Sequence, residues 1–452
     1  MLNREAQAMM GGGSVVRIPP QSNVPITPRV RRILDSAAIR RLASISQLGV
    51  VSLVYPGATH SRHEHSLGVY HECLRWMARL SNEPKWNDGV NERWLDALTV
   101  ASLVHDVGHW PFCHPIEDMD LPGLRRHEHR ARSFLDSEEL RFALEQDWRC
   151  DAADVEMLLN PKDASHESSD AAAVAMSASV LSGPIDIDKV DYLQRDSLHA
   201  GVPYGRHFDP DRLLSSLTVH PQKDRIAVGI KGRTAAEMMV FARYVMFSEV
   251  YWHSAVRSAT AMLQRAVFLL QHRMDLQASL SMGDAEWIEM LVQSAAGSVA
   301  EPLVDGLFGA RRRLFKRVAE FHAGDGQEVH RTLSRKPYWY LVAIAEDLSD
   351  RLSTTTGVVV HPADILIDAP PVKLEVDIDM DLVDADRQIV HRLADLSPVT
   401  GALADQQFDR VVKRVRVFVR PDLRESLASK VRFEDWHELL LRSCEHLEAT
   451  MA

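Results

Sequence analysis

Apolar residues recur every three or four positions along much of the first 275 residues, which is the spacing that gathers them on one face of a helix. One such series consists of Leu67, Tyr70, Leu74 and Met77. Another lies in residues 95–104, an apolar run without glycine or proline. The pattern predicts a mainly α fold built around a helical core.

Two strand-like segments interrupt the helical pattern. Residues 214–220 and 225–230 flank the sequence Pro-Gln-Lys-Asp at 221–224, which predicts a short β-hairpin. Residues 234–275 then predict either one long amphipathic helix or two closely spaced ones. The chain is expected to stay helical to about Ser353.

Beyond Ser353 the pattern changes to short β-branched segments that proline and aspartate interrupt. These segments are residues 358–360, 365–367, 373–378 and 411–419. They predict a small α+β subdomain near the C-terminus, which a helix over residues 434–449 closes.

The length of 452 residues suggests roughly two or three domains or subdomains. The first 26 residues contain three consecutive glycines and a Pro-Pro pair, and we expect them to form a flexible or extended arm. The predicted division is an arm over residues 1–26, a helical core over 27–275, a helical extension over 276–355 and the α+β subdomain over 356–452.

Composition limits the class of protein. The formal charge of −11 argues against general binding to duplex nucleic acid, whose affinity comes mainly from phosphate neutralisation, although a local cluster of Arg and Lys can still hold a small phosphate ligand. The four cysteines form no CxxC pair, and no apolar run approaches the ~20 residues of a membrane span. The N-terminus also lacks the apolar region of a signal peptide. We therefore expect a cytoplasmic protein without a membrane partner.

The apolar run of residues 95–104 ends in His105 and Asp106, shortly before Gly108. We expect both side chains in the last turn of a buried helix, where neighbouring residues point about 100° apart. Burying a histidine and an aspartate there is costly unless something pairs with them, and a metal ion is the simplest partner. The alternative is a pair that caps the end of a core helix.

His65 stands where the chain enters the helix of the Leu67 series. His63 and His65 cannot share a helical face, so at most one of them is expected to bind an ion. We choose His65 because it is nearer the buried positions. The alternative is a core histidine whose partners are all within the protein.

Asp188 begins a charged stretch in which Lys189, Tyr192 and Asp196 share one face of a predicted helix. A cation, a phenol and a carboxylate beside a candidate metal ligand are typical of a surface that contacts a substrate. The alternative is a solvated amphipathic face with local ion pairs.

Together, His65, His105, Asp106 and Asp188 can close around one divalent ion. Imidazole nitrogen and carboxylate oxygen suit Mn, Fe, Zn or Mg, and the residues do not choose among these metals. The leading hypothesis from the residues is a metal-dependent phosphohydrolase.

With these four residues the chain resembles the HD-domain phosphohydrolases. It is most similar to their deoxynucleoside triphosphate (dNTP) triphosphohydrolase branch, which includes the HD domain of the mammalian sterile-alpha-motif protein. The matching stretches are residues 47–49, 55–68, 105–114, 188–196, 242–244 and 250–253. They cover about residues 28–270 in the family's order, and the chain after residue 276 matches only loosely.

The resemblance implies a role for each motif residue. The implied metal ligands are His65, His105, Asp106 and Asp188. The implied proton donors and oxyanion stabilisers around the scissile phosphate are His109, His114 and His127. The residues implied to hold the nucleotide are Arg62, Lys189, Tyr192, Asp196, Arg243 and Tyr251, with Gln47 and Leu48 at the sugar.

The resemblance also implies a reaction and an assembly. In the family reaction, water attacks the α-phosphorus of the nucleotide and tripolyphosphate is released. The expected substrate is therefore a dNTP, and the expected assembly is a homodimer or homotetramer.

Two positions depart from the family pattern. Residues 22–26 replace the stretch in which guanine-activated members carry an aspartate, so activation by a guanine nucleotide is not expected. Trp110 stands where glycine is frequent in the family, next to the reacting phosphate. Two alternatives follow: a hydrolase of a monophosphate, a cyclic nucleotide or an alarmone, and a nucleotide sensor that does not cleave.

Overall fold

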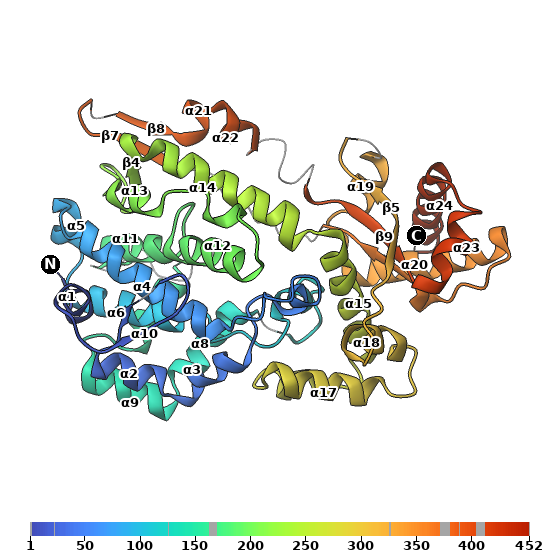
Figure 1. Cartoon of the computed structure of the whole chain (residues 1–452), viewed down its shortest axis with the longest axis horizontal. Helices are drawn as coiled ribbons and strands as arrows, with labels where there is room; N and C mark the ends of the chain where they lie inside the picture. Colours follow the sequence, from blue (N-terminus) through green and yellow to red (C-terminus); the bar gives the residue numbers. More distant parts are fainter. Residues whose placement is uncertain are drawn as a thin grey trace.

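Two hydrophobic cores organise the chain. A computed structural model describes residues 2–21, 23–124, 126–161, 170–324, 327–370, 380–387, 389–403 and 412–451. The fold is mainly helical with small sheets, which confirms the predicted fold class. The first half of the chain forms one lobe, and most of the second half forms the other (Figure 1).

Three helices of the first core position the candidate site: α4 (Arg62–Leu80), α6 (Glu92–Val104) and α12 (Ile187–His199). Each begins at a side chain that accepts a hydrogen bond from a backbone N–H of the first turn, respectively Ser61, Asn91 and Asp186. Every residue of α6 from Trp94 to Val104 is buried, as expected for a mostly apolar helix whose one acidic residue in this span, Asp96, has a partner in Arg29. Its C-terminal end therefore lies inside the lobe.

The N-terminal arm packs on this core, so the prediction of a flexible or extended arm was wrong for its first part. Helix α1 (Arg4–Gly11) is followed by β1 (Val15–Val16) and β2 (Val24–Pro25), which pair antiparallel. Within α1, the buried Glu5 forms an ion pair with Arg29. The Nη2 atom of Arg29 also lies 2.9 Å from Oδ1 of Asp96 in α6. The local sequence around Glu5 does not predict these ion pairs, because Arg29 and Asp96 are distant from it in the sequence.

The second core surrounds a three-stranded antiparallel sheet of order β5-β9-β6. The strands are β5 (Lys316–Phe321), β6 (Ile365–Asp368) and β9 (Val415–Val419). The helices of this core are α15 (Ser254–Leu270), α17 (Asp284–Ala295), α18 (Glu301–Phe308), α20 (Tyr338–Thr356) and α24 (Phe433–Met451). In Figure 1 this lobe lies on the right.

Several predictions for the second half are tested by these elements. Strand β5 shows that the expectation of continuous helix from residue 276 to Ser353 was wrong. Residues 358–360 form no strand, whereas β6, β9 and α24 confirm the other predicted segments that the structure describes. The predicted strand over residues 373–378 lies outside the described residues.

The predicted hairpin is present as β3 (Leu217–Val219) and β4 (Ile226–Gly229), and it is part of a larger sheet. Strand β7 (Asp381–Asp384) pairs parallel with β4, and β8 (Ile389–Arg392) pairs antiparallel with β7. The chain thus returns from the second lobe to the first, where β7 and β8 lie beside α14 (Arg233–Met246) at the top of Figure 1.

Of the two alternatives for residues 234–275, the structure shows two closely spaced helices. Helix α14 (Arg233–Met246) leads through a short π-helical turn, Phe247–Tyr251, into α15. The remaining α-helices are α2 (Pro28–Leu34), α3 (Ala37–Arg41), α5 (Pro84–Gly89), α7 (Cys113–Glu117), α8 (Ala131–Leu135), α9 (Glu138–Asp147), α10 (Ala152–Leu159), α11 (Ala171–Leu181), α13 (Pro210–Ser215), α16 (Leu276–Ser279), α19 (Gln327–Leu333), α21 (Leu393–Leu396), α22 (Pro398–Ala402) and α23 (Arg424–Ala428).

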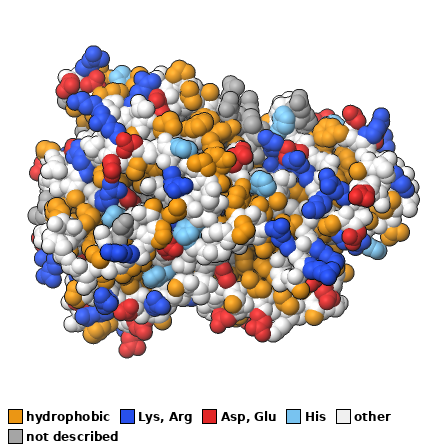
Figure 2. All heavy atoms as spheres, in the orientation of Figure 1, with side chains coloured by type: hydrophobic (Ala, Val, Ile, Leu, Met, Phe, Trp, Pro, Cys, Tyr) orange, Lys and Arg blue, Asp and Glu red, His pale blue; other side chains and the backbone are white. Residues whose placement is uncertain are grey.

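The surface carries both signs of charge. Figure 2 shows Lys and Arg side chains in number on the right-hand lobe, so the net charge of −11 does not make this face uniformly acidic. Among the described residues, no helix is both long and apolar enough to cross a membrane.

Removing the buried anchor of the arm should destabilise the first lobe. We expect Glu5→Ala to lower the free energy of unfolding by about 3–5 kcal/mol, because it leaves the buried Arg29 with one carboxylate fewer. Urea denaturation measures this change. Glu92→Ala is the control, since the Glu92 side chain is 51% exposed and its ion pair with Arg149 is worth at most about 1 kcal/mol. Equal stabilities for the two variants would show that the ion pair of Glu5 with Arg29 does not anchor the arm.

The sheet of the second lobe should confer a pH-dependent stability. Burial raises the pKa of Glu320, but hydrogen bonds from Arg416 and Arg414 outweigh it and lower that pKa from 4.5 to about 2. A depressed carboxyl pKa stabilises the fold above pH 4.5, and this stabilisation is lost as the pH falls toward about 2.

We therefore expect Glu320→Gln to be less stable than the native protein at pH 7 and to approach it as the pH falls through this window. Thermal denaturation at a series of pH values measures the difference. Glu328→Gln, at an exposed position of α19, should show no such convergence. A difference in melting temperature between Glu320→Gln and the native protein that stays constant with pH would show that the ionised Glu320 carboxylate is not the source of this stability.

Candidate metal centre

The ends of α4, α6 and α12 bring three potential ligands together. His65 lies in the first turn of α4, His105 follows the last residue of α6, and Asp188 lies in the first turn of α12. The His65 Nε2 atom is 3.0 Å from Asp188 Oδ1 and 3.2 Å from His105 Nε2. The three residues form a group that could hold a metal ion, with their ligand atoms within 4.8 Å of one another.

Hydrogen bonds on the far side of each imidazole decide which nitrogen faces this group. His105 Nδ1 lies 3.0 Å from the Ser102 carbonyl oxygen, and His65 Nδ1 lies 2.8 Å from Asp191 Oδ2. Both partners only accept, so both Nδ1 atoms donate and a neutral ring presents a lone pair at Nε2. Two lone pairs and the Asp188 carboxylate facing one another require a positive charge between them.

The raised pKa of His65 also indicates that a positive charge is favoured at its Nε2 atom. Burial lowers this pKa, but hydrogen bonds to Asp188 and Asp191 outweigh it and raise the pKa to about 10. In the metal-free protein a proton on Nε2 supplies the charge, and a divalent ion can replace that proton. The donor set therefore fits a divalent metal and does not identify which one.

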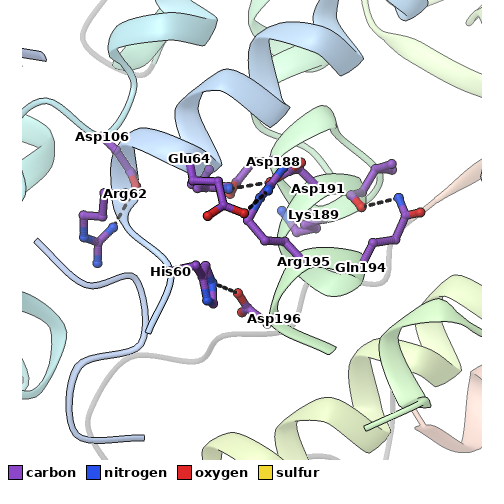
Figure 3. Close-up of polar contacts among 12 residues, drawn as sticks. His60, Arg62, Glu64, Asp106, Asp188, Lys189, Asp191, Gln194, Arg195 and Asp196 are labelled. Atoms are coloured by element: carbon purple, nitrogen blue, oxygen red, sulfur yellow. Dashed lines mark hydrogen bonds and ion pairs between the residues drawn. The ribbon is translucent and has the colours of Figure 1, made fainter. Parts of the chain in front are cut away.

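Asp106, the fourth predicted ligand, lies beside this group. Its Oδ1 atom is 3.5 Å from His105 Nε2, and its Oδ2 accepts a hydrogen bond of 2.7 Å from Arg62 Nη1 (Figure 3). Burial acts to raise the pKa of Asp106, but electrostatic interactions with His109, His105 and the Arg62 guanidinium hold it well below its usual value. The carboxylate is thus ionised and available on its Oδ1 side.

A residue that the sequence argument did not single out, Asp191, holds His65 in place. Asp191 is fully buried and also accepts hydrogen bonds from Arg195 Nε and Nη2, at 2.8 and 2.7 Å. Arg195 reaches Glu64 at 2.7 Å (Figure 3). It also reaches the side chain of Gln21 at 2.7 Å, so the N-terminal arm closes the network. The i, i+4 spacing of Asp191 and Arg195 is the sequence signal that could have found it.

His109, His114 and His127 gather into a second cluster. The Nε2 atoms of His109 and His114 lie 3.4 Å apart, and the rings of His109 and His127 have centroids 3.7 Å apart. Glu117 accepts from His127 Nδ1 at 2.9 Å. The His109 Nδ1 atom lies 3.4 Å from Asp106 Oδ1, so the cluster adjoins the candidate metal centre.

In the free protein, two of these histidines are neutral at pH 7. Loss of hydration where protein packs around the His114 ring lowers the pKa of this residue although it is exposed at one edge, and the charges of His127 and Arg62 act in the same direction. Burial and Arg62 likewise hold the pKa of His109 well below its usual value. The positive charge that we expected from these side chains therefore depends on an anion that enters the cluster.

The predicted nucleotide-binding residues form two neighbouring sets. Tyr251 donates a hydrogen bond of 2.6 Å to Asp196 Oδ2, and Asp196 Oδ1 lies 2.9 Å from His60 Nε2 (Figure 3). Burial raises the pKa of Tyr192, whereas the charges of Arg243 and Lys189 act to lower it, which places both cations near this phenol.

Lys189 has a partner of its own, since its Nζ atom lies 2.5 Å from Asp186 Oδ2. Gln47 is placed by its backbone, which donates to the His60 carbonyl at 2.9 Å, and its buried Oε1 has no donor among the described residues. Leu48 is half-buried against the first core. Trp110 is only 1% exposed and packs with Cys113 and Leu280, so its indole is not open for stacking on a base.

The family of the chain follows from comparison with known proteins. A family model described as the HD associated region matches residues 208–435, slightly more than half of the chain. The chain belongs to the HD-domain family. The resemblance found in the motifs is thereby confirmed.

Relatives of this HD-domain protein occur in archaea, bacteria and eukaryotes. It is 29% identical over 286 residues to MJ1154 of Methanocaldococcus jannaschii (61% of this chain, 54% of that protein) and 34% identical over 241 residues to YwfO of Bacillus subtilis (52% and 50%). It is 25% identical over 276 residues to the human deoxynucleoside triphosphate triphosphohydrolase SAMHD1 (56% and 44%). The matches span about half the length of these relatives.

Solved structures share the fold of this HD-domain protein. A hypothetical protein from Aquifex aeolicus, 25% identical, superposes with a TM-score of 0.70 over 92% of this chain and 99% of that one. A phosphohydrolase from Bacteroides thetaiotaomicron, 21% identical, gives 0.66 over 90% and 100%. The similarity to the Bacteroides thetaiotaomicron structure shows a shared fold and nothing about activity.

The orienting role of Asp191 can be tested by metal binding. We expect Asp191→Asn to weaken divalent metal binding by about 10–100-fold, because the carboxylate no longer fixes the His65 ring and its tautomer. Isothermal titration calorimetry with Mn²⁺ measures the affinity. Asp211→Asn, at a position whose side chain is 82% exposed, is the matched control. Native affinity in Asp191→Asn would show that the carboxylate has no such role.

Proposed function

We propose that the protein is a metal-dependent phosphohydrolase that cleaves dNTPs to the deoxynucleoside and tripolyphosphate. The observation that carries the proposal is the pair of Nε2 lone pairs that His65 and His105 direct at the Asp188 carboxylate, next to a cluster of three histidines. The relatives named as deoxynucleoside triphosphate triphosphohydrolases support the choice of substrate.

His65, His105, Asp106 and Asp188 are the residues that would hold the divalent ion. Such an ion lowers the pKa of a bound water and polarises a phosphoryl oxygen, which are the two requirements of hydrolysis at phosphorus. Arg62 keeps the Asp106 carboxylate ionised and fixes its orientation through the 2.7 Å hydrogen bond.

The cations near α12 would bind the phosphate tail. The charges of Arg243 and Lys189 both act to lower the pKa of the Tyr192 phenol, so both cations lie near this residue of α12. A triphosphate is repelled by a protein whose net charge is −11 unless local cations neutralise it. Charge-assisted hydrogen bonds from these two side chains would supply that neutralisation.

The histidine cluster would move the proton. In the proposed reaction, an oxygen of water bonds to the α-phosphorus, the bond from that phosphorus to the 5′ oxygen breaks, and a proton passes to the 5′ oxygen. His114 is exposed to solvent at the edge of the cluster and is neutral in the free protein. The negative charge of the nucleotide would favour its protonated form, which can then act as the general acid.

The sugar would meet Gln47, whose Oε1 is a buried acceptor without a donor among the described residues. A sugar hydroxyl is a donor that fits it. Tyr251 and Asp196 present a hydrogen-bonded phenol and carboxylate that would contact the nucleoside. The resemblance also predicts a homodimer or homotetramer, which analytical ultracentrifugation measures.

A panel of nucleotides tests the proposal. With Mn²⁺, Mg²⁺, Fe²⁺ or Zn²⁺ supplied in turn, we expect phosphorus NMR to detect tripolyphosphate from dNTPs, and ¹⁸O from labelled water to appear in the tripolyphosphate. Faster hydrolysis of ribonucleotides, monophosphates, cyclic nucleotides or alarmones would identify that compound, and not a dNTP, as the substrate. Binding without turnover under every metal would indicate a sensor, and inertness toward all of them would reject the proposal.

The proton donor can be tested separately. We expect His114→Ala to lower kcat about 10²–10⁴-fold with little change in KM, because general acid catalysis contributes that much to such a step. His129→Ala is the matched control, because His129 is also exposed and lies in the neighbouring 3-10 helix His127–Arg130. A kcat equal to that of the control would remove His114 from the mechanism.

A further inference from the structure

Four potential metal ligands gather outside the centre of His65, His105 and Asp188. They are His109, Cys113, His114 and His127, and one donor atom from each lies within 4.8 Å of the others. His109 follows α6, Cys113 and His114 begin α7, and His127 begins the 3-10 helix His127–Arg130. His109 and Cys113 are buried, whereas His114 is exposed, so an ion has a path into the group.

The spacing of these atoms resembles that of ligands on a tetrahedral ion. With zinc–nitrogen bonds of about 2.0–2.1 Å, two imidazole nitrogens on one tetrahedral zinc lie about 3.3 Å apart. The Nε2 atoms of His109 and His114 are 3.4 Å apart. Cys113 Sγ lies 3.6 Å from Nδ1 of the His127 ring, which places the thiol beside that imidazole.

Glu117 gives His127 the orientation of a metal ligand. Its carboxylate accepts from His127 Nδ1 at 2.9 and 3.1 Å, and the other ring nitrogen, Nε2, is then the donor available to an ion. A carboxylate behind a ligating histidine is the usual arrangement in zinc sites. It repeats the relation of Asp191 to His65 in the first centre.

The chemistry of the donors separates the two groups. The first group offers imidazole and carboxylate, which suit harder ions, whereas the second offers three imidazoles and a thiol. We propose that His109, Cys113, His114 and His127 form a second, zinc-type metal site. Four protein ligands close the coordination of a tetrahedral ion, as in a structural rather than a catalytic zinc site.

An ion at this site would inhibit hydrolysis, a consequence that rests on the proposed function. A ring nitrogen that binds zinc can neither donate nor accept a proton. The three histidines that would stabilise and protonate the substrate are the same three that the ion would bind. Occupancy of the second site by zinc would therefore switch off an enzyme that the ion of the first site switches on.

Zinc stoichiometry tests the site directly. We expect atomic emission of the dialysed full-length protein to give two zinc ions per chain for the native protein and one for Cys113→Ser. Cys150→Ser, which alters another buried cysteine, is the matched control and should keep two. His65→Ala should keep the second ion while losing the first.

His114→Ala gives an independent variant, because truncation of an exposed side chain removes no core packing. We expect it to lower the second zinc affinity by more than the ~10–100-fold that loss of an outer partner costs. With Co²⁺ in place of zinc, the native protein should show the absorption of a cobalt–thiolate bond, and Cys113→Ser should not. One zinc in the native protein, or two of unchanged affinity in Cys113→Ser, would overturn the proposal.

Inhibition is measured for each variant relative to its own activity without added zinc. We expect excess zinc to suppress the manganese-loaded native protein and Cys150→Ser, and to suppress Cys113→Ser at least about 10-fold less. Equal suppression would refute the inhibitory role. If no nucleotide is hydrolysed, the proposed function fails while the zinc count still decides the site. If hydrolysis occurs with a single zinc ion bound, only the second site fails.

Discussion

Two imidazole nitrogens that carry no hydrogen in the neutral ring face each other across 3.2 Å, with a carboxylate oxygen 3.0 Å from one of them. This contact follows from hydrogen bonds behind the rings, to the Ser102 carbonyl and to Asp191, which fix the tautomers. Such an arrangement is stable only with a positive charge at its centre, and most other features of the site serve to maintain it.

The supporting structure is a buried chain of alternating charges. Asp191 accepts from His65 and Arg195, Arg195 binds Glu64, and Gln21 of the N-terminal arm closes the ring. Breaking a buried network of this kind leaves an uncompensated charge, so the arm and α12 are coupled to the geometry of His65. A Cβ atom at Gly68 would lie 2.0 Å from Asp191 Oδ1, which explains the absence of a side chain there.

The sequence predicted those parts of the molecule that depend on local patterns. The helical core and the hairpin follow from periodicity, and the meeting of His65, His105 and Asp188 follows from ligand types at helix ends. What it could not predict depends on distant partners. Helix α1 is held by Arg29, β7 pairs with a strand more than 150 residues earlier, and Asp191 owes its role to the ring it faces.

Anomalous diffraction can locate a metal ion between the two imidazoles. Crystals grown with Mn²⁺ should show one strong anomalous peak within coordination distance of His65 Nε2, His105 Nε2 and a carboxylate oxygen of Asp188. The absence of a peak there, with the Nε2 atoms of His65 and His105 still facing each other, would show that this centre holds only a proton and no metal ion.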